Sequence, residues 1–265
     1  MLRLFISIDM VGSTQFKAQC AGSSGWLDTF RTFFTHLPLM LEGQLGFAFL
    51  ERDETPSVDI WKVMGDELLF TAEPNSAEEL LMILRAVLST MRMFEQQHYQ
   101  KLPLRLKGTA WLANFGEGNI EIDIPELTTG DGPPHVDFIG PDLDLGFRVT
   151  KFARPASLAL SLDLVEALLD SDDAQEVDLY LVGNEPLKGV MFGRPYPVIW
   201  MPDPDAGFDF LPWEIENDPL AAAVVKAEPT PHADLRQEIG NMRHYLSKMH
   251  GIDRPAYIFG DRSPS

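Results

Sequence analysis

Cysteine, long apolar runs and basic residues are all scarce in this 265-residue chain. Its single cysteine, Cys20, excludes an intrachain disulfide and has no zinc-ligand spacing around it, which is typical of a reducing compartment. No apolar stretch reaches the length of a membrane span, and the apolar run within Met1–Met10 is too short for a signal-peptide core. We therefore expect a cytoplasmic protein that binds no membrane.

Positive charge is outnumbered almost two to one. The chain carries 21 Lys and Arg residues against 40 Asp and Glu residues, a formal net charge of −19. Such a surface repels nucleic acid and anionic membranes, so we expect no nucleic-acid partner. A small anionic ligand stays compatible with this charge where bound metal ions or a local basic cluster invert the field. The six histidines show no metal-ligand spacing and receive no role.

The hydrophobic pattern alternates between strand-like and helix-like segments, and 45% hydrophobic residues suffice for a large core. Strands are expected at 2–9, 58–64, 67–73, 102–115, 119–124, 157–161, 177–183 and 195–201, and helices at 26–43, 76–98, 142–153, 162–169 and 233–250. Gly65-Asp66 predicts a hairpin between the second and third strands, and 119–124 is expected to pair with 102–115. A Gly/Pro/Thr-rich loop is expected over 125–135. This mixture predicts an α/β or α+β protein with a mixed sheet.

A change of composition after Pro202 predicts two parts. Residues 1–202 form the predicted catalytic domain, and residues 203–265 form a Pro-rich C-terminal appendage with an amphipathic helix at about 233–250. The apolar face of that helix packs onto its own domain or across a dimer, or else recruits another protein. We expect packing onto its own domain or across a dimer, and not recruitment of another protein.

The segment FISIDMVGST places an ionisable acid, Asp9, at the end of a buried strand. A carboxylate that leaves water needs a partner, because burying it alone is costly. Asp66 stands at the predicted hairpin tip, and if the two strands are neighbours, both acids could share divalent ions of the kind used in phosphoryl chemistry. The turn at Gly12, Ser13 and Thr14 could hold phosphate oxygens with its backbone N–H groups. The alternative is that both acids are solvated strand caps.

Three segments, FISIDMVGST, KVMGDELLF and DFIGPDLDLGFRVTKFA, follow one another in the order and spacing of the class III nucleotide cyclase catalytic domain. The later segment LKGVMFGRPYPVIW resembles the closing part of that domain. The chain therefore resembles this family over about residues 1–200. The resemblance implies the class III cyclase fold, a ferredoxin-like, palm-type mixed antiparallel sheet flanked by helices.

The resemblance implies roles for individual positions. Asp9 and Asp66 match the two metal-binding aspartates, and the carbonyl of Met10 falls where a backbone oxygen joins the second of two divalent ions, Mn²⁺ or Mg²⁺. Lys62 and Asp137 match the two positions that contact the base. Without the resemblance, Lys62 could be a solvated strand residue and Asp137 the cap of a loop.

Two further positions lie in the predicted helix at 142–153. Arg148 matches the arginine that stabilises charge on the transferring phosphate, and Asp144 stands where the family usually has asparagine. Asparagine can donate a hydrogen bond to the ribose, whereas an ionised aspartate only accepts. Either the nucleotide is held differently, or Asp144 stays protonated, or the site is impaired. Arg148 could instead pair with Asp142 or Asp144, as in an ordinary helix.

The family's reaction is attack of the ribose 3′-hydroxyl on the α-phosphate with release of pyrophosphate. The metal aspartates come from one subunit and the base and arginine positions from its partner, which implies a homodimer with shared active sites. Within class III, the chain looks most like the pyrimidine cyclases of the bacterial Pycsar anti-phage system, whose cyclic UMP or cyclic CMP is read by a separate effector. We expect UTP as substrate, then CTP, then ATP, although a Lys–Asp pair does not decide the base. A nucleotide-binding module without turnover is the alternative.

Overall fold

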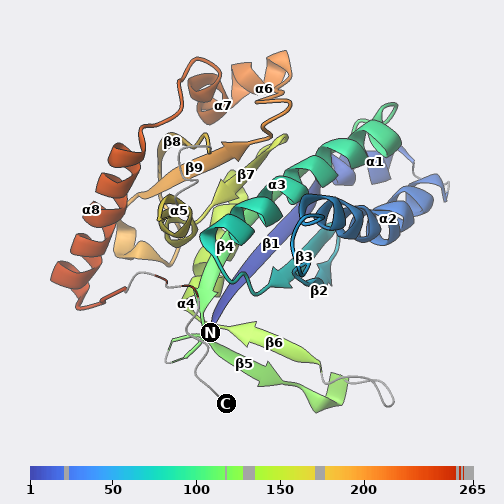
Figure 1. Ribbon diagram of the computed structural model, residues 1–265. Coiled ribbons are helices and arrows are strands. Elements are labelled where there is room, and N and C mark those ends of the chain that lie inside the picture. Colours follow the sequence, from blue (N-terminus) through green and yellow to red (C-terminus); the bar gives the residue numbers. More distant parts are fainter. Residues whose placement is uncertain are drawn as a thin grey trace.

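The computed structural model describes residues 1–20, 24–116, 118–127, 135–170, 177–254, 257 and 259. Its strands are β1 (Leu2–Val11), β2 (Val58–Met64), β3 (Glu67–Ala72), β4 (Arg105–Asn114), β5 (Ile120–Asp123), β6 (Val136–Ile139), β7 (Ser157–Leu160), β8 (Tyr180–Glu185) and β9 (Tyr196–Pro202). Seven of them form the central sheet, in the order β2-β3-β1-β4-β7-β9-β8, and β5 pairs with β6 in a separate ribbon that projects from one end of the sheet (Figure 1). Within the central sheet, only β4 and β7 run parallel. The predicted mixed, mostly antiparallel sheet is thereby confirmed.

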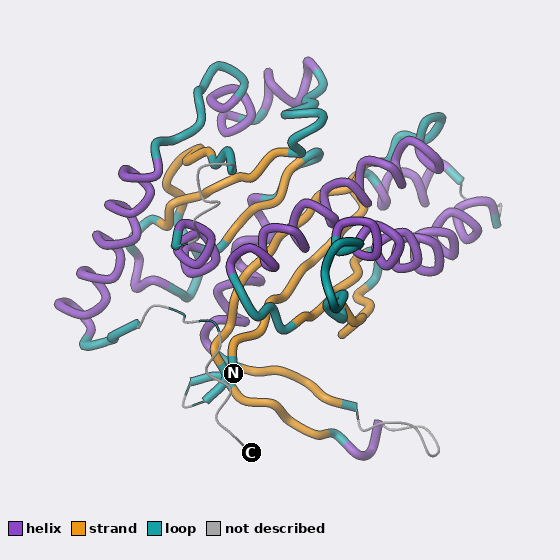
Figure 2. Tube along the Cα trace, viewed as in Figure 1, coloured by secondary structure: helices purple, strands orange, loops and turns teal. Residues whose placement is uncertain are grey.

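Helices cover both faces of this sheet. They are α1 (Ser13–Gln19), α2 (Gly25–Ala48), α3 (Ala77–Phe94), α4 (Pro141–Val149), α5 (Leu162–Leu169), α6 (Pro212–Asn217), α7 (Pro219–Val224) and α8 (His232–His250). The long helices α2 and α3 pack side by side across one face, which Figure 2 shows in purple against the orange strands. Helix α4 packs against β4 on the opposite face.

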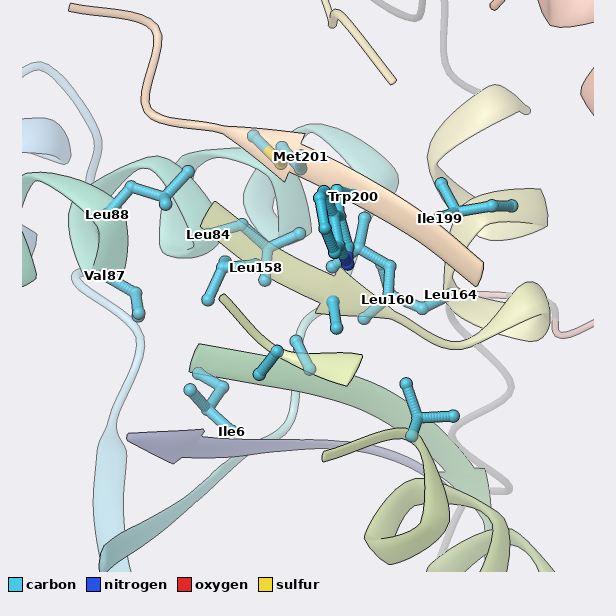
Figure 3. Close-up of a cluster of buried hydrophobic side chains, with 14 of the residues drawn as sticks. Ile6, Leu84, Val87, Leu88, Leu158, Leu160, Leu164, Ile199, Trp200 and Met201 are labelled. Atoms are coloured by element: carbon cyan, nitrogen blue, oxygen red, sulfur yellow. The ribbon is translucent and has the colours of Figure 1, made fainter. Parts of the chain in front are cut away.

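Side-chain alternation along β1 divides the interior into two clusters. Leu4, Ile6 and Ile8 belong to the main core between the sheet and helices α2, α3 and α5. Figure 3 shows part of this core, in which α3 side chains such as Leu84 face strands β7 and β9 near Leu158 and Met201. Because successive strand residues point to opposite faces, Phe5, Ser7 and Asp9 must lie on the other side, toward α4.

The smaller cluster on the α4 side is largely aromatic. Phe5 stacks on Trp111 of β4 at 5.7 Å between ring centroids, and it meets Trp61 of β2 and Phe138 of β6 edge-on at 5.1 and 5.2 Å. Aromatic pairs at these distances add stabilisation beyond the area they bury. The cluster therefore holds β2 and β6 against the centre of the sheet, on the face that also carries Asp9.

Two expected elements differ from the structure. Residues 119–124 do not pair with the preceding strand; β5 pairs antiparallel with β6 instead, so the predicted loop at 125–135 is the connection within this ribbon. That connection begins with a 3₁₀ turn, Pro125–Leu127, and residues 128–134 lie outside the described part of the chain. The helix expected to end at Gly43 continues to Ala48, because Leu45 is buried in the main core and outweighs the glycine's low helix propensity.

Smaller differences concern helix ends and short helices. The expected helix at 76–98 is α3 followed by a π-helical turn, Glu95–Tyr99, and the expected helix at 142–153 is α4 followed by a 3₁₀ turn, Thr150–Phe152. Another 3₁₀ turn, Met191–Gly193, precedes β9. The pattern did not predict α1, α6 or α7, since helices of six or seven residues carry too few turns for a period to show.

The last helix packs onto the body of the protein. Helix α8 lies against α5, and its Leu235, Ile239, Met242 and Leu246 are buried in the main core. Of the two expected arrangements, packing onto its own domain or across a dimer, the structure shows the first, while the domain boundary at residue 202 stays a prediction. Among the described residues, no helix combines the length and apolar character needed to cross a bilayer.

Candidate active site

Asp9 lies in a row of charged residues across the sheet. Its direct cross-strand neighbours are Glu67 on β3 and Lys107 on β4. Residues directly opposite each other in antiparallel strands share a face, so all three side chains are on the α4 side. The Lys107 ammonium lies 3.1 Å from Asp9 Oδ2, and both side chains are 27% exposed. Lys107 is therefore the partner that the partly buried Asp9 requires.

Asp66 is brought to the same edge by the β2–β3 turn. The Met10 amide donates to the Asp66 carbonyl oxygen at 3.2 Å, and the buried Ser13 hydroxyl donates to Asp66 Oδ2. Since β1 and β3 are neighbours, the condition for Asp9 and Asp66 to act together is met. The Met10 side chain is buried in the main core, which leaves only its backbone for the edge.

Burial and nearby negative charge raise the pKa of two acids at this edge, Asp9 and Glu67. Burial raises the pKa of Asp9; Lys107 opposes this effect and the charge of Asp66 adds to it. Burial also raises the pKa of Glu67, where a hydrogen bond from Ser7 opposes the effect and the charges of Asp9 and Asp66 add to it. A positive charge placed near these carboxylates would stabilise their ionised form.

The residue types at this edge are suited to divalent ions. Mg²⁺ prefers oxygen ligands and is usually held by one or two carboxylates plus waters and substrate phosphates. Asp9 and Asp66 supply such oxygens at one edge of the sheet, where Asp9 is partly buried. No group of three or more His, Cys, Asp or Glu residues suited to a metal occurs within the described ranges. The edge therefore suits ions whose ligands come partly from the protein and partly from a substrate or water, and the described residues do not supply a complete set of ligands.

The turn after β1 requires a glycine. Gly12 has φ +86°, and a Cβ atom there would lie 2.6 Å from the Pro103 carbonyl oxygen. Helix α1 begins directly after it, so Ser13 and Thr14 are its first two residues. The Ser13 side chain is engaged with Asp66, while Thr14 is exposed. Phosphate binding by the amides of this turn stays a prediction.

The two predicted base-contacting residues lie together. Lys62 Nζ is 2.5 Å from Asp137 Oδ1, which joins β2 to β6 on the α4 side of the sheet. Burial alone would raise the pKa of Asp137, but hydrogen bonds from Lys62 and the Phe138 amide, together with the Lys62 charge, lower it. The Lys62 ammonium also lies 4.4 Å from the Trp61 ring centroid. A positive donor and an ionised acceptor are thus held side by side.

Asp144 and Arg148 are exposed on α4. Within the described residues neither side chain makes an ion pair or a hydrogen bond, so the expected alternative of an Arg148–Asp142 or Arg148–Asp144 pair is wrong. Asp142 instead accepts hydrogen bonds from Arg254 and Tyr257. Asp144 lines a groove of about 570 Å³ between α4, the turn at 187–193 and the end of α8. Among the described residues, no hydrogen bond or ion pair joins Asp144 or Arg148 to Asp9 or Asp66.

Helix α4 approaches the sheet closely at Gly146, midway between those two residues. A Cβ atom at Gly146 would lie 2.3 Å from the Trp111 ring. We expect Gly146→Ala to lower the free energy of unfolding by about 1–3 kcal/mol, because the helix must move off the aromatic cluster. Gly43→Ala in α2 is the control: its Cβ would meet nothing within 4 Å, so the substitution should be neutral or stabilising by up to about 1 kcal/mol. Denaturant unfolding measures both, and equal effects would contradict this packing.

The sequence did not single out Lys107 or Glu67. The sequence did contain one indication of Lys107, because a lysine interrupts the apolar positions of the strand-like LPLRLKGTAW segment. Its meaning depends on the register that sets it opposite Asp9, and register between strands almost 100 residues apart cannot be read locally.

Comparisons with solved structures identify the fold. The adenylyl cyclase CyaB from P. aeruginosa matches with a TM-score of 0.51 at 15% identity, over 80% of this chain and 95% of that one. The guanylate cyclase domain of RhGC from Catenaria anguillulae, solved with GTP, matches with a TM-score of 0.53 at 10% identity, over 76% and 95%. An adenylate cyclase from Trypanosoma brucei gives 0.52 at 14%, over 78% and 91%. No protein-family model and no curated protein matches the sequence. The chain has the class III cyclase fold.

Proposed function

We propose that this protein is a nucleotide cyclase that converts UTP to cyclic UMP and pyrophosphate. The observation that carries the proposal is the meeting of Asp9 and Asp66 at one edge of the sheet, on the fold that adenylyl and guanylyl cyclases use. The Lys62–Asp137 pair on the same side of the sheet supports a nucleotide base as part of the ligand. CTP and ATP are the alternative substrates.

Each residue has a defined task in this reaction. Two divalent ions, when bound, would supply activation of the 3′-hydroxyl and charge neutralisation on the phosphates. Asp9 and Asp66, with the Met10 carbonyl, would hold them. Arg148 places a permanent positive charge near the α-phosphate as negative charge develops there. The amides after Gly12 orient the leaving phosphates.

The side-by-side pair of Lys62 and Asp137 favours a base edge with one acceptor next to one donor. The ammonium can donate to a uracil carbonyl, and the carboxylate can accept from the neighbouring N–H. Adenine offers a ring acceptor beside an amino group and satisfies the same pair. The sequence resemblance to pyrimidine cyclases therefore supports UTP, and with it a product read by a separate effector in anti-phage defence.

Product analysis tests the proposal. Purified protein is incubated with UTP, CTP, ATP or GTP and Mn²⁺, and the products are separated by chromatography and mass spectrometry. We expect cyclic UMP as the main product, and a loss of about a thousandfold or more in Asp66→Ala, since a bound divalent ion contributes several kcal/mol to the transition state. Asp59→Ala, an exposed acid on β2, is the matched control.

Each other outcome has a clear meaning. Cyclic AMP as the main product would replace UTP by ATP and keep the cyclase. No cyclic product from any nucleotide, with a dimeric protein, would favour a binding module without turnover, and Asp144→Asn would then be the first variant to assay.

A further inference from the structure

Lys107 contacts the carboxylate of Asp9, which we have proposed as a metal ligand. Its ammonium lies 3.1 Å from Asp9 Oδ2. Lys107 and Glu67 are the two cross-strand neighbours of Asp9. In the protein without substrate, a lysine therefore supplies part of the counter-charge that divalent ions would supply at the same carboxylate.

We propose that Lys107 is a positioning residue that keeps metal affinity low until an anionic nucleotide arrives. The inference rests on the proposed metal site at Asp9. A metal–oxygen bond of about 2.1 Å would place the ion against a carboxylate whose oxygen already contacts the ammonium. Two cations cannot occupy one carboxylate without repulsion, so the first ion must displace Lys107 or bind beside it at a cost in affinity.

The ion pair itself is easily broken. Both side chains are 27% exposed, and a pair in contact with solvent contributes little to stability. Lysine carries its charge on a flexible four-carbon stem, so the ammonium can swing away while β4 stays in place. A triphosphate gives it a new anionic partner. Lys107 in this way couples metal binding to nucleotide binding.

Glu67 explains why the lysine returns after product leaves. Ser7 lies two residues before Asp9 on β1 and donates a hydrogen bond to Glu67. This bond holds the Glu67 carboxylate on the same face as Asp9. Together with Asp66, the edge carries three acids and one lysine. Once metal and phosphates depart, the net negative charge draws the ammonium back.

Direct measurement of Mn²⁺ binding, without nucleotide, tests this role. The wild type, Lys107→Met, Lys107→Arg and Lys101→Met are titrated with Mn²⁺ while the free ion is followed by electron paramagnetic resonance. We expect Lys107→Met to lower the Kd for Mn²⁺ about tenfold or more, equivalent to about 1.4 kcal/mol. Lys107→Arg keeps the charge and should retain weak binding. Lys101→Met, an exposed lysine outside the site, should match the wild type.

Several outcomes would overturn the proposal. Equal affinity in the wild type and Lys107→Met, including undetectable binding in both, excludes a gating role. An equal gain in Lys101→Met would assign the effect to net charge alone. Thermal unfolding without metal confirms that each variant is folded.

Failure of this inference is distinguishable from failure of the cyclase proposal. Cyclic nucleotide production by the wild type together with equal Mn²⁺ affinities would overturn the role of Lys107 only. Tighter Mn²⁺ binding in Lys107→Met with no cyclic product from the wild type would keep the role of Lys107 and overturn the cyclase.

Discussion

Replacing Arg254 by methionine is expected to lower the free energy of unfolding by about 3–5 kcal/mol. Arg254 Nη2 lies 2.6 Å from Asp142 and 2.7 Å from Asp163, and the three side chains are 16%, 7% and 9% exposed. Burial alone would lower the pKa of Arg254, but the two carboxylates outweigh it and raise the pKa. The guanidinium thus stays charged and neutralises both acids. Its loss leaves two buried charges without a cation, which is the costly way to break an ion pair.

This cluster joins the C-terminal segment to the predicted site. Asp142 is in the first turn of α4, the helix that carries Asp144 and Arg148, and Asp163 is in the first turn of α5. Arg254 follows α8 and bridges the two helices. The segment after α8 therefore fixes the start of α4 from outside the sheet. We expect Arg254→Met to impair any activity that depends on α4, beyond its effect on stability.

Chemical unfolding followed by circular dichroism measures the change. Arg31→Met, on the exposed side of α2, is the matched control and should stay within about 0.5 kcal/mol of the wild type. In the triple variant Arg254→Met, Asp142→Asn, Asp163→Asn, the buried charges are removed together, so part of the loss should be recovered. A change below about 1 kcal/mol in Arg254→Met would contradict the cluster's contribution.

Mixing two inactive variants is expected to restore activity. Asp9→Ala removes a proposed metal ligand, and Arg148→Ala removes the proposed phosphate-stabilising charge. Arg148 is exposed on α4 and, among the described residues, makes no ion pair or hydrogen bond with Asp9 or Asp66, as expected if it serves the site of a second copy. In a head-to-tail homodimer, each mixed dimer then has one intact site. Random exchange of equal amounts gives about one quarter of the wild-type rate, since half of the dimers are mixed and half of their sites are intact.

A second mixture provides the control. Asp9→Ala and Asp66→Ala both damage the metal side, so no dimer of these chains contains an intact site. Activity is measured as cyclic nucleotide formation after exchange, and differently tagged chains are purified to verify that mixed dimers formed. An inactive Asp9–Arg148 mixture with verified mixed dimers would contradict shared sites, and rescue in the Asp9–Asp66 mixture would contradict the assignment of both acids to one side.

Local features of the chain were predicted well. The hairpin at 58–64 and 67–73 matches β2 and β3 closely, because Gly65 and Asp66 define a turn between two short apolar runs. The same turn carried Asp66 into the candidate site. The helix at 162–169 matches α5 in full, since its apolar residues follow a helical period after a serine cap. Such signals lie within a few residues of the structure they determine.

Pairings between distant segments were not predictable in this way. The ribbon of β5 and β6 was missed because the partner of β5 follows the loop and does not precede it. The alternation of residues along a strand shows which side chains share a face, but it does not show which strand pairs with it. For the same reason the sequence showed that Asp9 needs a partner but did not identify Lys107.

The sequence by itself determined which segments have the period of a strand or of a helix, where turns occur, and which motifs resemble those of class III cyclases. It also placed Asp9 near the end of a buried strand, although that strand continues to Val11. Only the tertiary structure decided that Lys107 and Glu67 flank Asp9, that Lys62 meets Asp137, and that Arg254 closes on Asp142 and Asp163. The physical reason is that secondary structure follows from nearby residues, whereas a charge finds its counter-ion through strand register and helix packing, which depend on the whole chain at once.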